Sequence, residues 1–358
     1  MKAVVLVSPR HLAVQEVPKF ELNPDQVMIR VESCGICGSD LRYFAGENPW
    51  ALHTLGINAP NESNMILGHE FAGTVAEVGS PAFRDQLGKR VAVIPYNTCG
   101  KCEFCRSGRY NLCRSTLHIG HGAGWGKMDY YPGGMAEYCP VWQTHLCELP
   151  DAISSDDAAI IDPLSVAIHA ISLVGIKPLD QILVLGSGPV GLCIAQAVRA
   201  YGADQVYCTD ITGISLEIAR QVGVDAALDA RDEGLYENIM ALTRGKGVNV
   251  VFDTVGSAVS QKLALSLLAV SGSLVNLVAN ETAVDFRLMD LSGERRIICS
   301  ANSKYDDYLL GIRLMAKGLV KAGPLITHRF PIESTPQAFE LLLNKEASGA
   351  LKVVIHPN

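Results

Sequence analysis

The chain contains 358 residues, of which 48% are hydrophobic and 19% charged, and its formal net charge is −7. This composition excludes a disordered or fibrous chain, and the negative charge argues against nucleic acid or an anionic membrane as a partner. The length predicts two domains. The apolar run at residues 1–7 is too short for a signal peptide or a membrane span, so we expect a cytoplasmic protein.

Residues 1 to about 155 carry short β-type runs, at 27–31, 71–78 and 90–94, separated by glycine, proline and asparagine. The pattern predicts a mainly β domain with irregular loops. Two loops at the ends of predicted strands carry a thiol, an imidazole and a carboxylate. Taken singly, such a cysteine or histidine more often packs in a core than binds a ligand. These side chains belong to Cys37, His69 and Glu70.

Eleven cysteines, an odd number, are not expected to form disulfides in a reducing compartment. Four of them have the spacing C-x2-C-x2-C-x7-C, which suits one tetrahedral zinc ion with no open position. Such an ion would stabilise a lobe rather than catalyse. An iron–sulfur cluster also uses short steps between cysteines, but no proline follows the last cysteine and no second cluster appears. The four residues are Cys99, Cys102, Cys105 and Cys113.

Beyond residue 155, strand and helix patterns alternate. Apolar strands are predicted at 181–186, 206–209, 248–255 and 273–278, and a helix follows the first of them. Continuous apolar strands separated by helices are typical of a parallel sheet covered on both faces.

The first of these strands runs into a G-x-G-x-x-G motif that opens the helix. Its glycines permit a tight turn and close approach of the backbone to a pyrophosphate, and the helix N-terminus attracts phosphate. This context predicts a dinucleotide site, whereas the alternative is a turn that binds no ligand. The predicted binding residues are Gly186, Gly188, Pro189, Val190 and Gly191.

Asp210 ends the next predicted strand, nineteen residues after Gly191. From there a carboxylate can accept hydrogen bonds from ribose hydroxyls and repel the additional phosphate of NADP. Residues 211–214 contain no arginine or lysine that could bind that phosphate, so NAD is the predicted cofactor. The alternative is that Asp210 only caps the following helix.

Beyond residue 295 the pattern is less regular. Helices near 307–316 and 336–343 and a strand at 352–356 could return the chain to the first domain. We therefore assign residues 1–155, completed by 296–358, to one domain and residues 156–295 to the other.

Specific motifs are spread over nearly the whole chain. They are G-I-C-G-S-D at 35–40, G-H-E-F-A-G at 68–73, the four cysteines, G-G-M-A-E-Y at 133–138, D-P-L-S-V-A-I-H-A at 162–170, the glycine motif and L-I-T-H-R-F at 325–330. In combination they resemble the zinc-containing medium-chain dehydrogenases, and among these the sorbitol, threonine and butanediol dehydrogenases. The resemblance implies an α/β fold with a GroES-like, mainly β catalytic domain and a Rossmann cofactor domain on a doubly wound parallel sheet. It also implies two zinc ions per chain, one catalytic and one structural.

Residue by residue, the resemblance implies that Cys37 and His69 bind the catalytic zinc. Glu70 is implied as a direct or an exchanging ligand. Asp162 stands where relatives usually carry glutamate, and because its side chain is one methylene shorter, a water molecule could bridge it to the metal. Asp162 precedes a proline, so starting a helix is the alternative role for it.

Asp40 resembles the carboxylate that orients the liganding imidazole, and Ser39 resembles the hydroxyl that begins a proton relay. Residues 301–304 are Ala-Asn-Ser-Lys where sorbitol dehydrogenases have Phe-Arg-Tyr, so the substrate contacts of those enzymes cannot be transferred. Two long loops carry Trp50 and Trp125, which either shape the mouth of the active site or pack on their own loops.

These features predict NAD-dependent oxidation of a secondary alcohol, such as a polyol, a sugar alcohol or a sugar-derived hydroxyl. A threonine-type amino alcohol is an alternative substrate. A zinc-free, NADPH-dependent quinone or enone reductase is an alternative class, which the metal-binding residues argue against. The expected partner is a small-molecule alcohol, and the apolar run at 296–300 could supply a sheet edge for a homodimer or homotetramer.

Overall fold

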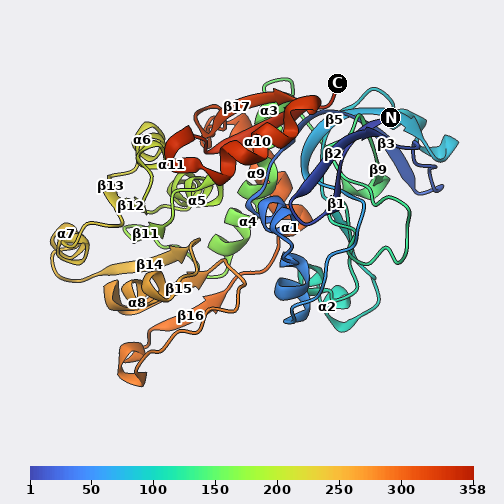
Figure 1. Ribbon diagram of the computed structural model, residues 1–358. Helices are drawn as coiled ribbons and strands as arrows, with labels where there is room; N and C mark the ends of the chain where they lie inside the picture. The colour runs from blue at the N-terminus through green and yellow to red at the C-terminus, as the bar shows by residue number, and fades with distance from the viewer. The chain divides into compact units, whose positions relative to one another are not determined.

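The computed structural model describes all residues from 1 to 358 and divides them into two compact units. The first comprises residues 1–162, 304–316 and 326–358, and the second comprises residues 163–303 and 317–325. Figure 1 shows the elements of each unit in colours that follow the chain.

These divisions differ from the predicted boundaries for three physical reasons. Helix α3 (Ser155–Ala158) contacts β3 and β5 of the first unit, so that unit continues past residue 155. Strand β16 (Arg296–Cys299) pairs with β15, which keeps residues up to 303 in the second unit. Within residues 317–325, the Lys321 amide donates to Gln196 Oε1 at 2.8 Å, which ties this segment to the second unit.

The first unit is built on a seven-stranded sheet. Its strand order is β10-β6-β5-β3-β18-β17, with β9 also paired to β3. Only β17 and β18 run parallel to each other; the other pairs are antiparallel. The strands are β3 (Gln26–Gly35), β5 (Glu70–Val78), β6 (Arg90–Val93), β9 (Tyr138–Trp142), β10 (Leu146–Glu148), β17 (Ile326–Pro331) and β18 (Lys352–His356).

Strand β3 is the centre of this sheet, and most of its ten residues are buried. It pairs with three strands, and one of them, β18, comes from the C-terminal end of the chain. The return of the chain that residues 352–356 predicted is therefore present. Smaller sheets in the same unit consist of β1 (Lys2–Ser8), β2 (His11–Glu16) and β4 (Met65–Ile66), and of β7 (Tyr96–Asn97) and β8 (Leu117–His118).

The helices of the first unit are short and lie at the ends of strands or in loops. Helix α10 packs against β17, β18 and β2, and its buried residues include Phe339. The helical segments are α1 (Gly38–Ala45), η1 (Ala51–Leu55), η2 (Pro81–Gln86), α2 (Glu103–Arg106), η3 (Tyr110–Leu112), η4 (Gln143–His145), α3 (Ser155–Ala158), α9 (Tyr305–Ala316), η7 (Ile332–Ser334), α10 (Thr335–Leu343) and α11 (Lys345–Ser348). Helix α4 (Ile161–Ser172) spans the division between the units.

The second unit is a six-stranded parallel sheet with the order β13-β12-β11-β14-β15-β16. The chain winds from β11 toward β13 and then from β14 toward β16, which is the doubly wound arrangement that the sequence predicted. Its strands are β11 (Gln181–Leu185), β12 (Gln205–Asp210), β13 (Ala226–Asp229), β14 (Val248–Asp253), β15 (Leu268–Asn276) and β16. The helical segments are α5 (Pro189–Ala200), α6 (Gly213–Gln221), α7 (Leu235–Leu242), α8 (Ala258–Leu267), η5 (Leu288–Leu291) and η6 (Gly323–Leu325).

Burial explains the continuous apolar runs of the second unit. Four of the five residues of β11 are buried, because this strand has a neighbour on each side and α5 packs on it. A strand covered in this way needs apolar side chains on both of its faces. Across the whole chain, no helix combines the length and the apolar character needed to cross a bilayer.

Substitution of Phe339 by alanine should destabilise the first unit by about 3–5 kcal/mol, because the ring is fully buried against Phe44, with 5.5 Å between ring centroids. Leu343→Ala on the same helix should cost less than about 0.5 kcal/mol, since Leu343 is 48% exposed. The chain's three tryptophans all lie in the first unit, so urea unfolding followed by tryptophan fluorescence measures this difference. Equal losses in the two variants would contradict the packing.

Candidate functional site

The register between β3 and β5 brings the two predicted ligand loops together. Gly35, the last residue of β3, lies opposite Glu70, the first residue of β5. The chain leaves β3 through Cys37 and enters α1, while His69 immediately precedes β5. Antiparallel pairing therefore places both loops at the same end of the sheet.

Three ligand-type atoms converge at this point. One atom each from Cys37, His69 and Glu70 lies within 4.8 Å of the others. Ser39 Oγ is 3.4 Å from His69 Nε2, and Asp40 Oδ1 is 3.6 Å from His69 Nδ1. Because Nδ1 faces Asp40, Nε2 is the ring nitrogen available to a metal, in the manner of a carboxylate–histidine–metal arrangement.

Asp40 is fixed by the backbone around it. Its Oδ2 accepts a hydrogen bond from the Cys37 amide at 2.8 Å, and its Oδ1 accepts one from the Gly68 amide at 3.3 Å. Asp40 thus connects the Cys37 loop to the His69 loop, and its position in the first turn of α1 also favours a carboxylate.

Several groups that can carry negative charge are buried together in this place. Burial raises the pKa of the Cys37 thiol, of the Asp40 carboxyl and of the Asp162 carboxyl. Desolvation makes each ionised form costly unless a positive charge compensates it. The convergence of a thiol, an imidazole and a carboxylate therefore fits a divalent metal ion, and this donor set suits zinc.

The partner of Glu70 could not be foreseen from the sequence. Lys352, at the start of β18, donates from Nζ to Glu70 Oε2, and both side chains are almost completely buried. The same Nζ donates to the Ile36 carbonyl at 3.1 Å. A Cβ at Gly35 would lie 2.6 Å from Glu70 Oε2, so glycine leaves room for the pair. The only signal in the sequence was a lysine that opens a predicted strand, and this did not identify its partner.

Asp162 lies at the start of α4 and does not join the three converging atoms. Its Oδ1 accepts a hydrogen bond from the Tyr308 hydroxyl, a second contact that sequence analysis missed. His69 lowers the pKa of the Asp162 carboxyl and so opposes the effect of burial, which indicates that Asp162 faces the same region. Its direct ligation of a metal stays a prediction.

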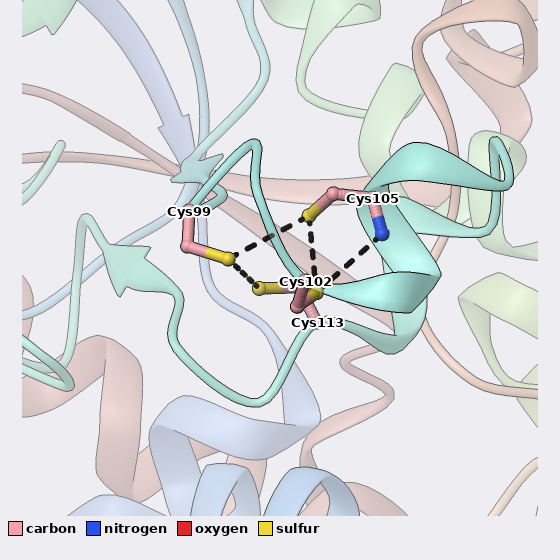
Figure 2. A group of neighbouring side chains, drawn as sticks. All are labelled: Cys99, Cys102, Cys105 and Cys113. Atoms are coloured by element: carbon pink, nitrogen blue, oxygen red, sulfur yellow. Dashed lines mark hydrogen bonds between the residues drawn. The ribbon is translucent and has the colours of Figure 1, made fainter.

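The four-cysteine group is compact, as Figure 2 shows. Its sulfur pairs are separated by 3.5 Å for Cys102 and Cys105, 3.6 Å for Cys113 and Cys99, and 3.9 Å for Cys99 and Cys105. Zn–S bonds of about 2.3 Å in a tetrahedron place sulfurs about 3.8 Å apart. The observed separations fit a single ion, whereas an iron–sulfur cluster would place its own atoms between the cysteines.

The local structure of the lobe favours a thiolate at Cys99 and disfavours one at Cys113. Hydrogen bonds from the backbone around Lys101 and Cys102 lower the pKa of Cys99 to about 6, whereas burial raises the pKa of Cys113 to about 12. Cys102 caps α2, and its sulfur accepts from the Cys105 amide at 3.5 Å. None of the eleven cysteines forms a disulfide.

The glycine motif of the second unit lies where the sequence predicted it, between β11 and α5. Gly188 precedes the helix, and Pro189 is its first residue, followed by Val190. A Cβ at Gly191 would lie 1.9 Å from the Gly186 carbonyl oxygen, so only glycine permits this close contact between helix and turn. Amide groups at such a helix N-terminus can bind phosphate, so the predicted cofactor contact keeps its structural basis.

Asp210 lies at the end of β12 and contacts this turn. Its Oδ2 accepts from the Ser187 amide and its Oδ1 from the Thr212 amide, both at 2.8 Å. The contact with Thr212 is local and fits the alternative that Asp210 caps the start of the next helix. The contact with Ser187, in contrast, reaches back to the glycine motif. Asp210 is therefore more than a cap of the following helix.

The two tryptophans of the long loops are occupied by internal contacts. Trp50 Nε1 donates to Thr116 Oγ1 at 2.9 Å, and Trp125 Nε1 donates to the His118 carbonyl at 2.7 Å. Trp125 also stacks on Trp142, with 5.4 Å between ring centroids. Thr116, His118 and Trp142 lie outside the two loops, so both tryptophans pack on neighbouring segments rather than on their own loops.

Comparison with known proteins finds two matching family descriptions and many relatives. An alcohol dehydrogenase GroES-like domain matches residues 23–151, and a zinc-binding dehydrogenase domain matches residues 189–317. The chain is 32% identical over 359 residues to a sorbitol dehydrogenase of Bacillus subtilis, covering 100% of this chain and 98% of that protein. It is also 32% identical over 353 residues to an L-threonine 3-dehydrogenase of Rhizobium johnstonii, covering 96% and 95% of the two chains.

Solved structures resemble the whole chain as well. An alcohol dehydrogenase of Escherichia coli in complex with NADH has a TM-score of 0.88 at 26% identity, covering 99% of both chains. A Sinorhizobium meliloti protein described as a zinc-binding dehydrogenase, with NADP bound, has a TM-score of 0.88 at 29% identity and the same coverage. The fold thus accommodates either nicotinamide cofactor.

Substitution of Cys105 by serine should reduce the bound zinc from two ions to one per chain, because one of the four sulfurs that suit a tetrahedral ion is lost. Metal analysis of the purified protein measures this change. Cys299→Ser is the matched control, since Cys299 is exposed and lies outside both groups. Unchanged zinc content in C105S, or iron in the unaltered protein, would contradict a zinc site.

Proposed function

Because the chain belongs to the zinc-containing alcohol dehydrogenases of the medium-chain superfamily, we propose that it transfers a hydride from a secondary alcohol to NAD at a zinc ion. It is an oxidoreductase that acts on CH–OH groups and uses zinc and a nicotinamide cofactor. The observation that carries the proposal is the convergence of Cys37, His69 and Glu70, with Ser39 Oγ at 3.4 Å from the imidazole.

We assign the catalytic zinc to Cys37, His69 and Glu70, with Asp162 as a further or water-bridged ligand, and a structural zinc to the four cysteines. When bound, the catalytic zinc supplies a Lewis acid that lowers the pKa of an alcohol. Ser39 is positioned to receive the proton of the substrate hydroxyl and pass it outward. Asp40 orients His69 through Nδ1 and stabilises the ring position.

The cofactor site in this proposal is the turn of Gly186, Gly188 and Gly191 with the first turn of α5, which includes Pro189 and Val190. Solved relatives hold NADH or NADP, so the preference depends on this chain's own residues. Asp210 supports NAD, because its carboxylate touches the glycine turn and no arginine or lysine follows within residues 211–214.

The substrate is a polyol, a sugar alcohol or a sugar-derived hydroxyl in this proposal, with a threonine-type amino alcohol as the second candidate. One relative is named a sorbitol dehydrogenase and another an L-threonine 3-dehydrogenase, at the same identity. Residues for two metal sites are present, which disfavours a zinc-free quinone or enone reductase.

The oligomeric state and the cellular location of the protein also belong to the proposal. Strand β16 is an outer strand of its sheet, and Ile297 on it is 38% exposed. We propose that a homodimer or homotetramer forms through this edge, since an unpaired strand edge favours pairing with a second chain. The cytoplasmic location stays a prediction.

Substitution of Ser39 by alanine should lower kcat by about 10²- to 10⁴-fold, because the hydroxyl that receives the substrate proton is lost. Zinc content and nucleotide binding should stay unchanged. Ser266→Ala is the control, since Ser266 lies on the exposed side of α8 in the second unit. Stopped-flow and steady-state NADH absorbance measure the rates, and unchanged turnover in S39A would refute the proton relay.

Substitution of Asp210 by asparagine should reduce the preference for NAD over NADP by about 10- to 100-fold, the effect of one charged hydrogen bond. Asparagine keeps an acceptor oxygen for the Ser187 amide and removes the charge. Asp229→Asn is the matched control, because Asp229 lies opposite Asp210 at the end of β13 and pairs with Arg231. The ratio of kcat/KM for the two cofactors is the measurement, and an unchanged ratio in D210N argues against this role.

A further inference from the structure

Four aromatic rings form a continuous stack in the first unit. Their order is Tyr43, His121, His118 and Tyr96, with 5.0, 4.2 and 5.3 Å between successive ring centroids. Tyr96 and His118 are register partners of β7 and β8. We name the two central imidazoles, His118 and His121, the histidine wall.

The histidine wall lies directly beside the proposed metal site. Gly120, between the two histidines, packs so closely on the other loop that a Cβ there would lie 2.7 Å from the Gly68 carbonyl oxygen and 3.2 Å from His69 Cβ. At the other end of the stack, Tyr43 belongs to α1, the helix that carries Ser39. The wall therefore contacts two segments of the proposed active site: the loop that carries His69 and the helix that carries Ser39.

Each imidazole of the wall has unused hydrogen-bonding capacity. Nδ1 of both rings is sealed from solvent and has no partner. Nε2 of both rings also lacks a partner within the chain, but it is not sealed. Because an orphaned buried N–H is rarer than an orphaned acceptor, the proton belongs on Nε2. His118 and His121 therefore carry two N–H donors for which the chain supplies no acceptor.

The wall carries no charge. Burial lowers the pKa of His118 to about 3 and, together with His118 itself, lowers that of His121 well below its ordinary value. No carboxylate pairs with either ring. The buried cation of this region, Lys352, is paired with Glu70, and Asp40 Oδ1 lies 3.6 Å from His69 Nδ1. Apart from the metal ion, an anionic substrate group would meet neutral donors and a nearby carboxyl group, without a free cation from these residues.

We propose that His118 and His121 donate hydrogen bonds to hydroxyl groups of the substrate other than the one that is oxidised, so that the enzyme favours uncharged polyols over alcohols that carry a phosphate or a carboxylate. This inference rests on the proposed function and names its substrate class. It disfavours the amino acid alternative, because L-threonine carries a carboxylate and an ammonium group where the wall offers neutral donors.

The test compares His118→Phe and His121→Phe with the unaltered holoenzyme. Phenylalanine keeps the ring stack and removes the donor. The probes are sorbitol and xylitol as neutral polyols, and 2-butanol as an alcohol with a single hydroxyl. A sugar-alcohol phosphate serves as an anion, and L-threonine as a zwitterion that carries a carboxylate. Each substitution should lower kcat/KM for the polyols by about 3- to 10-fold, the effect of one neutral hydrogen bond, and leave 2-butanol within about twofold.

Three further measurements separate substrate recognition from structure. His118→Gln should recover part of the polyol activity, since its amide restores a donor. The phenylalanine variants should unfold at the same or a higher temperature, because removal of a sealed, unpartnered nitrogen does not cost stability. Both should retain two zinc ions per chain, and His11→Gln, an exposed histidine on β2, should change nothing.

The possible failures are distinguishable. If the unaltered enzyme oxidises none of these alcohols with NAD or NADP, the proposed function falls and the inference falls with it. A second outcome is that the unaltered enzyme oxidises 2-butanol while kcat/KM for polyols stays unchanged in the phenylalanine variants. In that case the wall binds only water, and the inference alone is wrong. A preference for the anionic substrates, or loss of zinc in the phenylalanine variants, also overturns it.

Discussion

The pairing of β3 with β5 is the contact on which the catalytic unit depends. Gly35 faces Glu70 across this ladder, and each strand continues into a loop that carries candidate ligands, Cys37 from one and His69 from the other. A shift of register by one residue would turn Glu70 to the opposite face of the sheet and separate it from Lys352. Backbone hydrogen bonds between two strands thus determine the composition of the metal site.

The charges of these buried groups then determine which ligand the site can hold. The region combines a thiol and several carboxyl groups whose ionised forms are disfavoured by burial, and one lysine compensates only part of that charge. A bound dication makes the same residues mutually compatible. The neutral imidazoles of the histidine wall fit this pattern, because they add hydrogen-bonding capacity next to the site without a further charge.

Features with short sequence spacing could be predicted, and long-range contacts could not. The four cysteines lie within fifteen residues, from Cys99 to Cys113, so their spacing alone indicated one metal ion. The glycine motif was recognisable because its strand and helix are adjacent in the sequence. The partners of Glu70 and Asp162 lie 282 and 146 residues away, and no local pattern identifies Lys352 or Tyr308. The predicted domain boundaries differ from the two compact units for the same reason, since β16 and residues 317–325 are tied to the second unit by hydrogen bonds rather than by composition.

The late position of β18 has a consequence for synthesis of the chain. Residues 163–303 leave the ribosome before Lys352, so the parallel sheet of the second unit can assemble while the seven-stranded sheet still lacks two strands. During that interval Glu70 lacks the ammonium group of Lys352. The loop that carries Cys37 also lacks its contacts with β18. The nascent catalytic unit is therefore the more exposed to misfolding and proteolysis. A chain truncated before Lys352 would combine an intact nucleotide fold with an unfinished metal site.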